Sequence, residues 1–284
     1  MKFLSVFSGI EAASVAWKDL AGWEAQGISE IDPFASAVLA NHYPHTQNYG
    51  DITKHPTWEI TPGSIDLLIG GSPCQSFSLS GKRLGLQDIR GQLSLTYISL
   101  VATVRPRFIV WENVVGCLTS NKGRDFGCFL YELGKLGYGI CWRVLDSQNW
   151  GLAQRRRRVW LVASLGNTAT PASILFQSEG ESWNKQKDFK GAVSPTLQTT
   201  AHDYSRADSF VAIEDSNGLR RLTITEAERL QGFPDGWTQV PWKGKPKERC
   251  PDSLRFKAVG NSMSVPVVRW IGQRIASIEA GAVL

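Results

Sequence analysis

Short apolar runs and stretches of helical pattern alternate through the first half of the chain. Apolar runs bounded by Gly, Pro or polar residues predict buried strands over 3–7, 26–31, 65–69 and 108–111. Helical patterns lie between them. One predicts a helix over 11–20, and another helix is predicted to open at Pro33, because proline is favoured in a first turn. Strands that alternate with helices indicate an α/β fold in which helices cover both faces of a largely parallel sheet.

The rest of the chain departs from this alternation. The apolar runs 138–145 and 159–163 have no helical pattern between them and predict an antiparallel strand pair at one sheet edge. From 166 to 215 the chain is polar, rich in Ser and Thr and without a sustained period, which predicts loops and short strands of a second, smaller unit. Helical pattern returns at 223–231 and 265–278.

The composition fits one globular core with a small appendage, since 42% of the 284 residues are hydrophobic. The apolar start of the chain is too short for a secretory signal, and no apolar stretch reaches membrane-spanning length, so we expect a soluble intracellular protein. The five cysteines include no Cys-x-x-Cys pair and the four histidines do not cluster with them, so neither a disulfide framework nor a metal site is expected.

The net charge of +5 is by itself a weak argument for a nucleic-acid partner, and the placement of the basic residues is more informative. Four consecutive arginines occupy 155–158, and a second basic group lies within 243–249. Phosphates would attract the arginine block, but a solvated charged turn explains it as well. The alternation of Gln154, Arg156 and Arg158 before an apolar run indicates instead a strand with one functional face.

One cysteine stands where an open α/β sheet places its sites. The segment 70–78 reads GGSPCQSFS and follows a predicted buried strand, so Cys74 lies just beyond the carboxyl end of that strand. Pro73 fixes the approach of the chain, and a helix N-terminus or nearby arginines would lower the pKa of the thiol for nucleophilic attack. The alternative is a buried structural cysteine, which would be preferred on the Pro-Cys pair alone.

A carboxyl group occupies the end of a second strand. Glu112, in the sequence Trp111-Glu112-Asn113-Val114, follows four apolar residues. Partial burial there would raise the pKa of Glu112 and let it form hydrogen bonds while protonated. The alternatives for Glu112 taken singly are a helix N-cap and a surface acid.

With these motifs in view, the chain resembles the DNA cytosine-C5 methyltransferase family over nearly its full length, with the motifs in the family's order. The motifs that carry the resemblance are Phe7-Ser8-Gly9, Glu30, Gly50-Asp51-Ile52, Pro73-Cys74-Gln75, Glu112-Asn113-Val114, Gln154 to Arg158, Arg220 with Leu222, Thr223, Glu226, Arg229, Gly232, Phe233 and Pro234, and Gly260-Asn261-Ser262. The resemblance implies a Rossmann-like, S-adenosylmethionine-dependent methyltransferase fold with a mixed sheet. It also implies a catalytic domain over 1–165 and 258–284, and a small, irregular, β-rich target-recognition domain over 166–257.

The resemblance further implies S-adenosylmethionine as cofactor and double-stranded DNA as partner, with a monomer expected. Glu30 resembles the acid that binds the cofactor ribose, and Asp51 the residue that reads the adenine amino group. The residues expected to bind the cofactor are Phe7, Ser8, Gly9, Glu30, Ile31, Asp51, Ile52, Pro73, Asn261 and Ser262. The residues expected to contact DNA are Gln75, Ser78, Ser80, Lys82, Arg83 and Arg90, in a predicted loop that closes over DNA, and Gln154, Thr196, Leu197 and Arg220.

The chemistry implied by the resemblance begins with a cytosine that leaves the base stack, because its ring atoms cannot be attacked inside a duplex. The Cys74 thiolate adds to C6, and protonated Glu112 forms hydrogen bonds at N3 and the exocyclic amine. C5 then takes the methyl group, a base removes the C5 proton, and Cys74 is eliminated. Arg158 and Arg156 lie beside the target base and hold its oxygen or a nearby phosphate.

The chain departs from the family's pattern in two places. Ile10-Glu11-Ala12 stands where the first motif usually continues with paired glycines, and Glu11 at a helix start would cap that helix or meet the positive end of its dipole. The region between the arginine motif and Thr196-Leu197 is short for the family, so the recognition domain is reduced.

Alternative functions remain open on the sequence. A tRNA cytosine-C5 methyltransferase shares the core motifs, and a catalytically inactive module that binds S-adenosylmethionine or DNA is a rival of another class. A nicotinamide-binding Rossmann protein would need Gly-x-Gly-x-x-Gly after the first strand. Residues 7–12 read FSGIEA, which does not match that motif.

The small size favours a bacterial or phage enzyme in the cytoplasm of a bacterium or an infected cell. The DNA sequence recognised, and whether the enzyme accompanies a restriction enzyme, protects a phage or acts alone, stay open.

Overall fold

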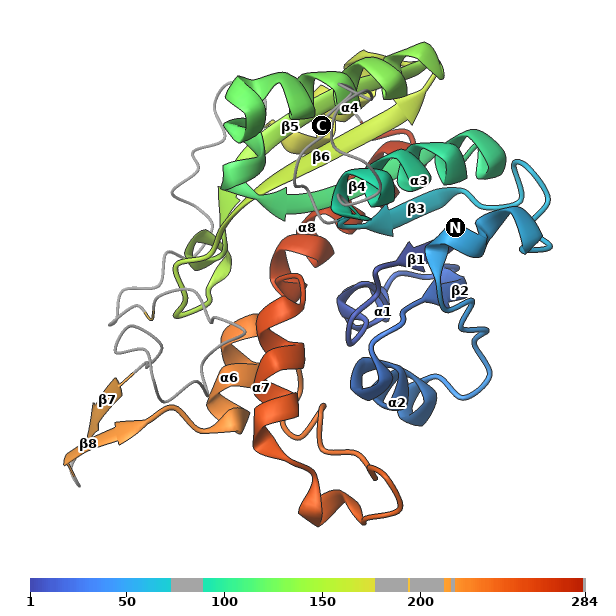
Figure 1. Ribbon diagram of the computed structural model, residues 1–284. Coiled ribbons are helices and arrows are strands. Elements are labelled where there is room, and N and C mark those ends of the chain that lie inside the picture. Colours follow the sequence, from blue (N-terminus) through green and yellow to red (C-terminus); the bar gives the residue numbers. More distant parts are fainter. Residues whose placement is uncertain (73–88, 177–193, 195–211, 216–217, 283–284) are drawn as a thin grey trace.

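The computed structural model describes residues 1–72, 89–176, 194, 212–215 and 218–282. Its centre is a mixed six-stranded sheet with the order β2-β1-β3-β4-β6-β5 (Figure 1). Strands β2, β1, β3 and β4 pair in parallel, and β6 is antiparallel to both β4 and β5, so β6 alone among these six runs against the others. The strand bounds are β1 (Lys2–Val6), β2 (Glu24–Ser29), β3 (Leu67–Gly70), β4 (Phe108–Val114), β5 (Tyr138–Asp146) and β6 (Arg157–Leu165).

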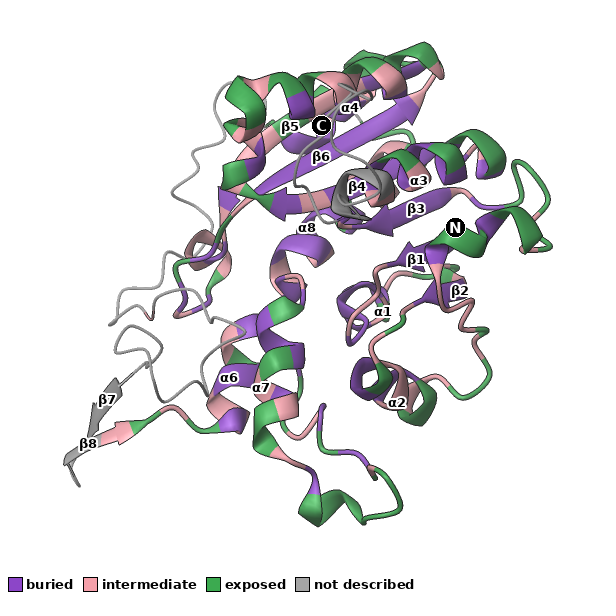
Figure 2. Ribbon diagram, in the orientation of Figure 1, coloured by how far each residue is buried: buried purple, intermediate pink, exposed green. Residues whose placement is uncertain are grey.

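Helices cover both faces of the sheet, as the alternation of strands and helices predicted. Leu67 and Ile69 of β3 join one buried cluster, while Leu68 between them joins the other, because successive strand residues point to opposite faces. The first cluster includes α1 (Ala12–Trp17), α2 (Pro33–His42), α5 (Ala169–Leu175) and α8 (Val265–Glu279), and the second includes α3 (Ile89–Val104) and α4 (Arg124–Lys135). Figure 2 shows the strands largely buried, with exposed positions on the outer sides of α2, α3 and α4.

The strand positions expected from the apolar runs are confirmed to within two residues at most boundaries. The expected antiparallel pair is also confirmed, with β5 at the edge of the sheet and β6 beside it. The helix predicted over 11–20 is shorter, since α1 ends at Trp17 and the chain turns there with a hydrogen bond from Leu20 N to Trp17 O. Short 3-10 helices are η1 (Ile52–Thr57), η2 (Val115–Leu118), η3 (Ser120–Gly123), η4 (Ser147–Trp150) and η6 (Lys247–Arg249).

Two α-helices of the described chain lie between α5 and α8 in the sequence. The first, α6 (Ile224–Gln231), begins with a capping box between Thr223 and Glu226, a signal that the sequence shows. The second, α7 (Asp252–Asn261), was not predicted. The fully buried carboxylate of Glu228 in α6 accepts hydrogen bonds from Arg255 of α7 and from the backbone and hydroxyl of Thr238. This network holds α7 against α6.

Part of the region predicted as a second, smaller unit packs instead against the central sheet. Helix α5 packs against β5, β6 and α8, so residues 169–175 lie with the sheet. Strands β7 (Ala212–Asp215) and β8 (Gly218–Arg221) form an antiparallel hairpin. Thr196 and Leu197 lie outside the described residues. In the described part of the chain, no helix combines the length and the apolar character that a membrane crossing requires.

Candidate functional site

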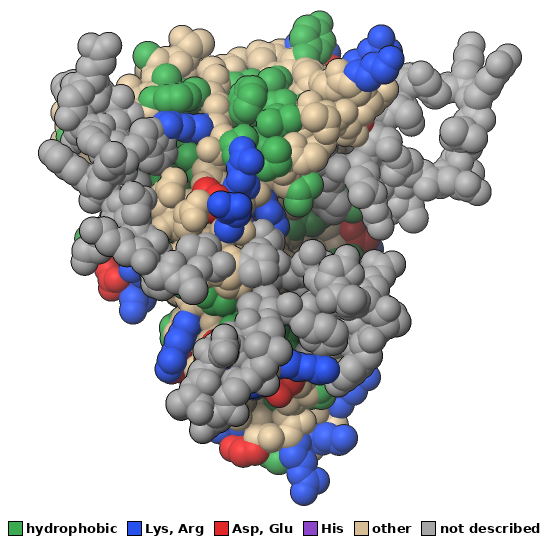
Figure 3. Space-filling view, turned by 90° about the vertical axis from the view of Figure 1, so that its left-hand side faces the viewer, with side chains coloured by type: hydrophobic (Ala, Val, Ile, Leu, Met, Phe, Trp, Pro, Cys, Tyr) green, Lys and Arg blue, Asp and Glu red, His purple; other side chains and the backbone are tan. Residues whose placement is uncertain are grey.

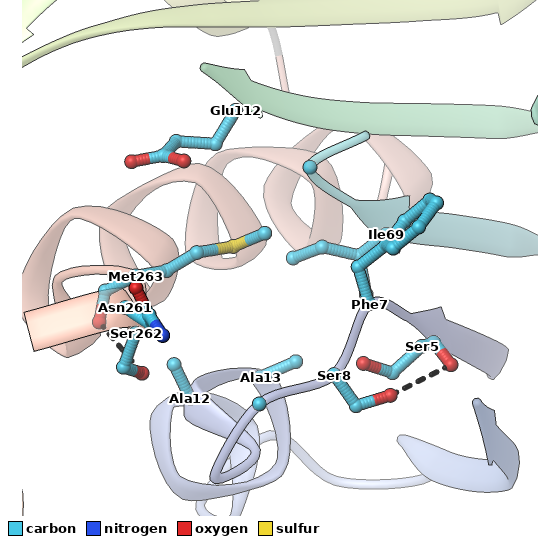
Figure 4. Close-up of a pocket in the computed structure, with 12 residues that line it drawn as sticks. Ser5, Phe7, Ser8, Ala12, Ala13, Ile69, Glu112, Asn261, Ser262 and Met263 are labelled. Carbon is cyan, nitrogen blue, oxygen red and sulfur yellow. Dashed lines mark hydrogen bonds between the residues drawn. The ribbon is translucent and has the colours of Figure 1, made fainter. Parts of the chain in front are cut away.

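Two adjoining pockets lie where β1, β2, β3 and β4 end, the edge at which open α/β sheets bind their ligands. The larger has a volume of about 300 Å³ and the smaller about 50 Å³. Both are lined by Phe7, Gly9, Gly71 and Asn261, so they form one continuous hollow. Figure 4 shows the smaller pocket, with Glu112 on the wall opposite the start of α1.

A carboxylate at the end of β2 organises the larger pocket. Glu30 accepts hydrogen bonds from the backbone amides of Gly9 (2.8 Å), Ile31 (2.9 Å) and Asp32 (2.7 Å). Burial raises the pKa of Glu30, and these amide bonds only partly offset that cost. The Ser8 hydroxyl donates to Ser5 O and accepts from Ser29 N, so the loop after β1 is fixed to the end of β2.

The expected cofactor residues divide into two groups. Phe7, Ser8, Gly9, Glu30, Asn261 and Ser262 line one or both pockets. Ile31 is 71% exposed beside Glu30 and lines neither pocket. Asp51 caps η1 by accepting from Thr53 N, and Ile52 is buried in the second core cluster. Neither Asp51 nor Ile52 lines a described pocket, and Pro73 lies outside the described residues.

Several lining residues were missed by the sequence reasoning. Lys257 of α7 forms an ion pair with Asp32 across 2.8 Å, and both residues line the larger pocket. Asp32 had a visible signal, because an Asp before Pro is a common helix start, and it caps α2. Lys257 had none, since α7 was not predicted. The other lining residues not predicted are Ser5, Ala12, Ala13, Phe34, Ala35, Ile69, Gly71, Leu254, Ala258 and Met263.

Glu11 is the N-cap of α1, so the expectation that it caps this helix is confirmed. Its Oε1 accepts from the backbone amide and the hydroxyl of Ser14, and its backbone adopts a left-handed φ of 65°. The side chain is fully buried, and this burial raises its pKa despite hydrogen bonds from Ser5 and Ser14. Glu11 therefore fixes the helix behind the smaller pocket and does not line it.

Glu112 of β4 faces two arginines of the neighbouring strand segment. Its Oε1 lies 3.2 Å from Arg158 Nε and 4.0 Å from Arg156 Nη2. Burial raises the pKa of Glu112, and the two positive charges oppose this rise without cancelling it. Among the described residues, this buried Oε1 receives no hydrogen bond of good geometry. The carboxyl is thus suited to remain protonated and to bind a group placed in the smaller pocket.

The predicted alternation of the arginine motif is confirmed. Gln154 and Arg156 are buried, whereas Arg155 and Arg157 are exposed. Gln154 Nε2 donates to Leu230 O at 3.2 Å, and the side chain has no exposed surface. The predicted contact of Gln154 with DNA therefore does not fit this structure, because a nucleic acid cannot reach a fully buried amide. Gln154 instead joins the motif to α6.

The chain that leads to the Pro-Cys motif is held by β4. Ser72 Oγ accepts from Trp111 Nε1 at 3.0 Å, and Ser72 O accepts from Asn113 Nδ2 at 2.6 Å. Cys74 follows Ser72 by two residues in the sequence. The positions Pro73, Cys74, Gln75, Ser78, Ser80, Lys82 and Arg83 lie outside the described residues, as does the side chain of Arg90.

Replacing Gly71 with alanine should destabilise the protein. A Cβ at this position would stand 2.6 Å from the carbonyl oxygen of Glu112, a backbone atom that cannot move away freely. We expect a loss of about 1–3 kcal/mol in the free energy of unfolding, the usual cost of overpacking. Urea denaturation measures it. Gly127→Ala in α4 is the matched control, since its Cβ would meet nothing within 4 Å; it should stabilise by about 0.4–1 kcal/mol. Equal effects of the two substitutions would contradict the steric argument.

Arg220, an expected DNA contact, is engaged within the protein. Its two terminal nitrogens bind both carboxylate oxygens of Glu226 at 2.9 and 2.8 Å, which lowers the pKa of Glu226 to about 2. This bidentate pair ties β8 to the capping box of α6.

Comparison with known proteins finds a matching family and several relatives. The sequence model of the C-5 cytosine-specific DNA methylases matches residues 1–210 and 175–277. A protein of Escherichia phage P1, named DNA N-6-adenine-methyltransferase, is 30% identical over 95% of this chain, which spans only 60% of that protein. The type II methyltransferase M.NgoBI of Neisseria gonorrhoeae is 31% identical over 94% of this chain and 90% of its own length.

The fold has solved counterparts. The crystal structure of the S. pombe Dnmt2 methyltransferase matches with a TM-score of 0.72 at 17% identity, over 99% of this chain and 100% of that one. This likeness shows the methyltransferase fold. Together with the match to the family's sequence model, it establishes that the chain belongs to the C-5 cytosine-specific DNA methylase family, whose members use S-adenosylmethionine as methyl donor.

Proposed function

We propose that this protein transfers a methyl group from S-adenosylmethionine to C5 of a cytosine swung out of duplex DNA, through a covalent adduct with Cys74. The observation that carries the proposal is the setting of Glu112. A buried carboxyl with a raised pKa, beside Arg158 and on the wall of the hollow, is suited to hold a neutral ring nitrogen.

The larger pocket is the proposed cofactor site. Its volume of about 300 Å³ is at the lower end of those that enclose small ligands. Glu30 receives three backbone amides, and a carboxylate has about four acceptor sites, so one remains for a ribose hydroxyl. The exposed side chain of Ile31 next to it would cover the adenine ring. When bound, S-adenosylmethionine supplies an electrophilic methyl group.

The residues of the chain would carry the remaining steps. The Cys74 thiolate forms a bond to C6 of the cytosine, and the ring electrons move toward C5. Protonated Glu112 donates to N3 and accepts from the exocyclic amine, which stabilises the charge that develops on the ring. Arg158 donates to the base oxygen. After C5 gains the methyl group and loses its proton to a water, the C6–S bond breaks and Cys74 leaves as thiolate.

Basic side chains support a nucleic-acid partner. Lys and Arg side chains are spread over the face in Figure 3 from its upper to its lower end. We keep the expected DNA contacts of Gln75, Ser78, Ser80, Lys82, Arg83, Arg90, Thr196 and Leu197 as part of the proposal. The recognition domain proposed for 166–257 contains α6 and the β7-β8 hairpin, and Arg220 joins this hairpin to α6.

A second candidate reaction follows from the phage P1 relative, whose name describes methylation of adenine at N6. The Cys74 and Glu112 motifs favour cytosine, because methyl transfer to an exocyclic amine needs no thiol that attacks the ring. The family match over most of the chain also favours cytosine.

The test is the identity of the methylated base. The purified protein is incubated with labelled S-adenosylmethionine and, separately, with unmethylated genomic duplex DNA and with total tRNA. One portion of each product is digested and its nucleosides are identified by mass spectrometry, and bisulfite sequencing of the DNA locates any 5-methylcytosine. We expect 5-methylcytosine in DNA, confined to one short sequence context. N6-methyladenine in DNA, or label in tRNA alone, would overturn the proposed base or the proposed substrate.

A further inference from the structure

Arg156 connects the carboxyl at Glu112 to the wall of the cofactor pocket. Its Nη1 donates to Gly260 O at 3.2 Å and its Nη2 to Ser262 O at 2.8 Å. The same Nη2 lies 4.0 Å from Glu112 Oε1. The guanidinium is only 3% exposed, and its pKa, lowered by burial to about 10, leaves it charged at neutral pH. Arg156 thus bridges β4 and the C-terminal end of α7.

The two carbonyls that Arg156 binds flank a segment of the cofactor pocket. Asn261 lines both pockets, and Ser262 and Met263 line the smaller one (Figure 4). A ligand in the hollow therefore contacts this segment on one side while Arg156 holds its backbone on the other. The backbone amide of Arg156 itself donates to Asp146 Oδ1 at 3.0 Å, which fixes the start of β6.

This geometry has an energetic consequence. A cofactor bound in the hollow would restrict the motion of Asn261, Ser262 and Met263, and hence of the guanidinium that holds the backbone of this segment. A restricted Arg156 keeps Glu112 in one position, so a base that binds Glu112 loses less conformational freedom when the cofactor is already present. The two terminal nitrogens of Arg156 are both engaged by carbonyls, which distinguishes it from Arg158, whose Nε faces Glu112.

We propose that Arg156 is a positioning residue that couples occupation of the cofactor pocket to affinity for the target DNA. The inference rests on the proposed function for the nature of the two ligands. A lysine at this position keeps the positive charge but has one nitrogen, and so cannot bridge the two carbonyls. The coupling should therefore be lost in Arg156→Lys even where the protein folds and binds each ligand alone.

The experiment measures DNA affinity with and without S-adenosylhomocysteine, with which no methyl transfer can occur. The probe is a duplex recovered from a random-sequence pool by binding to the unsubstituted protein, so the measurement does not depend on methylation. We expect S-adenosylhomocysteine to tighten DNA binding by about 5- to 150-fold, the usual range of coupling between sites. DNA should tighten S-adenosylhomocysteine binding by the same factor, since coupling is reciprocal. In Arg156→Lys both factors should fall toward one.

Two control variants separate coupling from a general structural role. Arg269→Lys also removes an arginine that donates to a backbone carbonyl, that of Ala16, but Arg269 lines neither pocket, and its coupling factor should stay unchanged. Arg158→Lys should weaken DNA binding and leave the coupling factor between S-adenosylhomocysteine and DNA unchanged. If Arg156→Lys lowers both affinities or the melting temperature while the factor persists, Arg156 is only structural and the inference is wrong. Coupling that holds in a protein giving no 5-methylcytosine would instead count against the proposed function alone.

Discussion

Glutamine in place of Glu112 is expected to lower the rate constant for methyl transfer by about 10²- to 10⁴-fold, the range by which acid–base groups accelerate reactions. The amide of glutamine can imitate the protonated carboxyl in donating to a ring nitrogen, so the base should still bind. It cannot share a proton with the ring as charge develops there, and that loss falls on the transition state. Single-turnover measurements with saturating DNA and cofactor isolate this step from product release.

The pH dependence gives this prediction a second readout. A carboxyl must be protonated to donate, and burial raises the pKa of Glu112 despite the positive charges of Arg156 and Arg158. The protonated form persists to higher pH than in an ordinary glutamate and is lost as the pH rises through the raised pKa. The rate constant should therefore fall on the alkaline side of its optimum in the unsubstituted protein, and this fall should disappear in Glu112→Gln.

A surface glutamate provides the control for this substitution. Glu132 in α4 is partly exposed, pairs with Lys135 and lines neither pocket, so Glu132→Gln should leave both the rate constant and its pH profile unchanged. S-adenosylhomocysteine affinity and the melting temperature show whether each variant is intact. If Glu112→Gln transfers methyl groups as fast as the unsubstituted protein, Glu112 does not act on the base.

The sheet could be predicted from the sequence because its strands are buried apolar runs that end at Gly or polar residues. β3 is the clearest case, with Leu67, Leu68 and Ile69 followed by Gly70 and Gly71. Helix α7 shows the opposite. Its apolar residues follow no clear helical stripe, and its place depends on partners distant in sequence, such as the pairs of Arg255 with Glu228 and of Lys257 with Asp32. No local pattern contains that information.

The same distinction applies to the site. Glu30 and Glu112 were found because each stands at a strand end within a recognisable motif, and the structure places both at the hollow. The partners of Arg156 could not be found in this way, since Gly260 lies 104 positions away and offers only a backbone carbonyl. The burial of Gln154 was equally hidden, because it depends on α6 packing over the start of the arginine motif. Motifs located the reacting groups, while the contacts that orient them required the folded chain.

Serine in place of Cys74 should reduce methyl transfer by roughly 10⁴-fold or more, the scale on which loss of a covalent nucleophile acts in other enzymes. A thiol with an ordinary pKa of about 8.5 is partly ionised near neutral pH, whereas a hydroxyl is not. The substitution replaces the sulfur atom with oxygen and leaves the rest of the side chain unchanged. Ser72 remains bound to Trp111 and Asn113, so the backbone that leads to position 74 should keep its path. S-adenosylhomocysteine binding should accordingly be unchanged.

Cys128→Ser in α4 is the matched control, because this free cysteine lies half-buried and lines neither pocket. Its single-turnover rate should equal that of the unsubstituted protein. Substantial transfer by Cys74→Ser would show that the reaction does not pass through a thiol adduct at C6. The product of that variant would then be examined for N6-methyladenine, because transfer to an exocyclic amine places no demand on a ring-attacking thiol. If Cys74→Ser loses methyl transfer while it still binds the cofactor, and Cys128→Ser keeps transfer, the result supports attack of the Cys74 thiol on the cytosine ring.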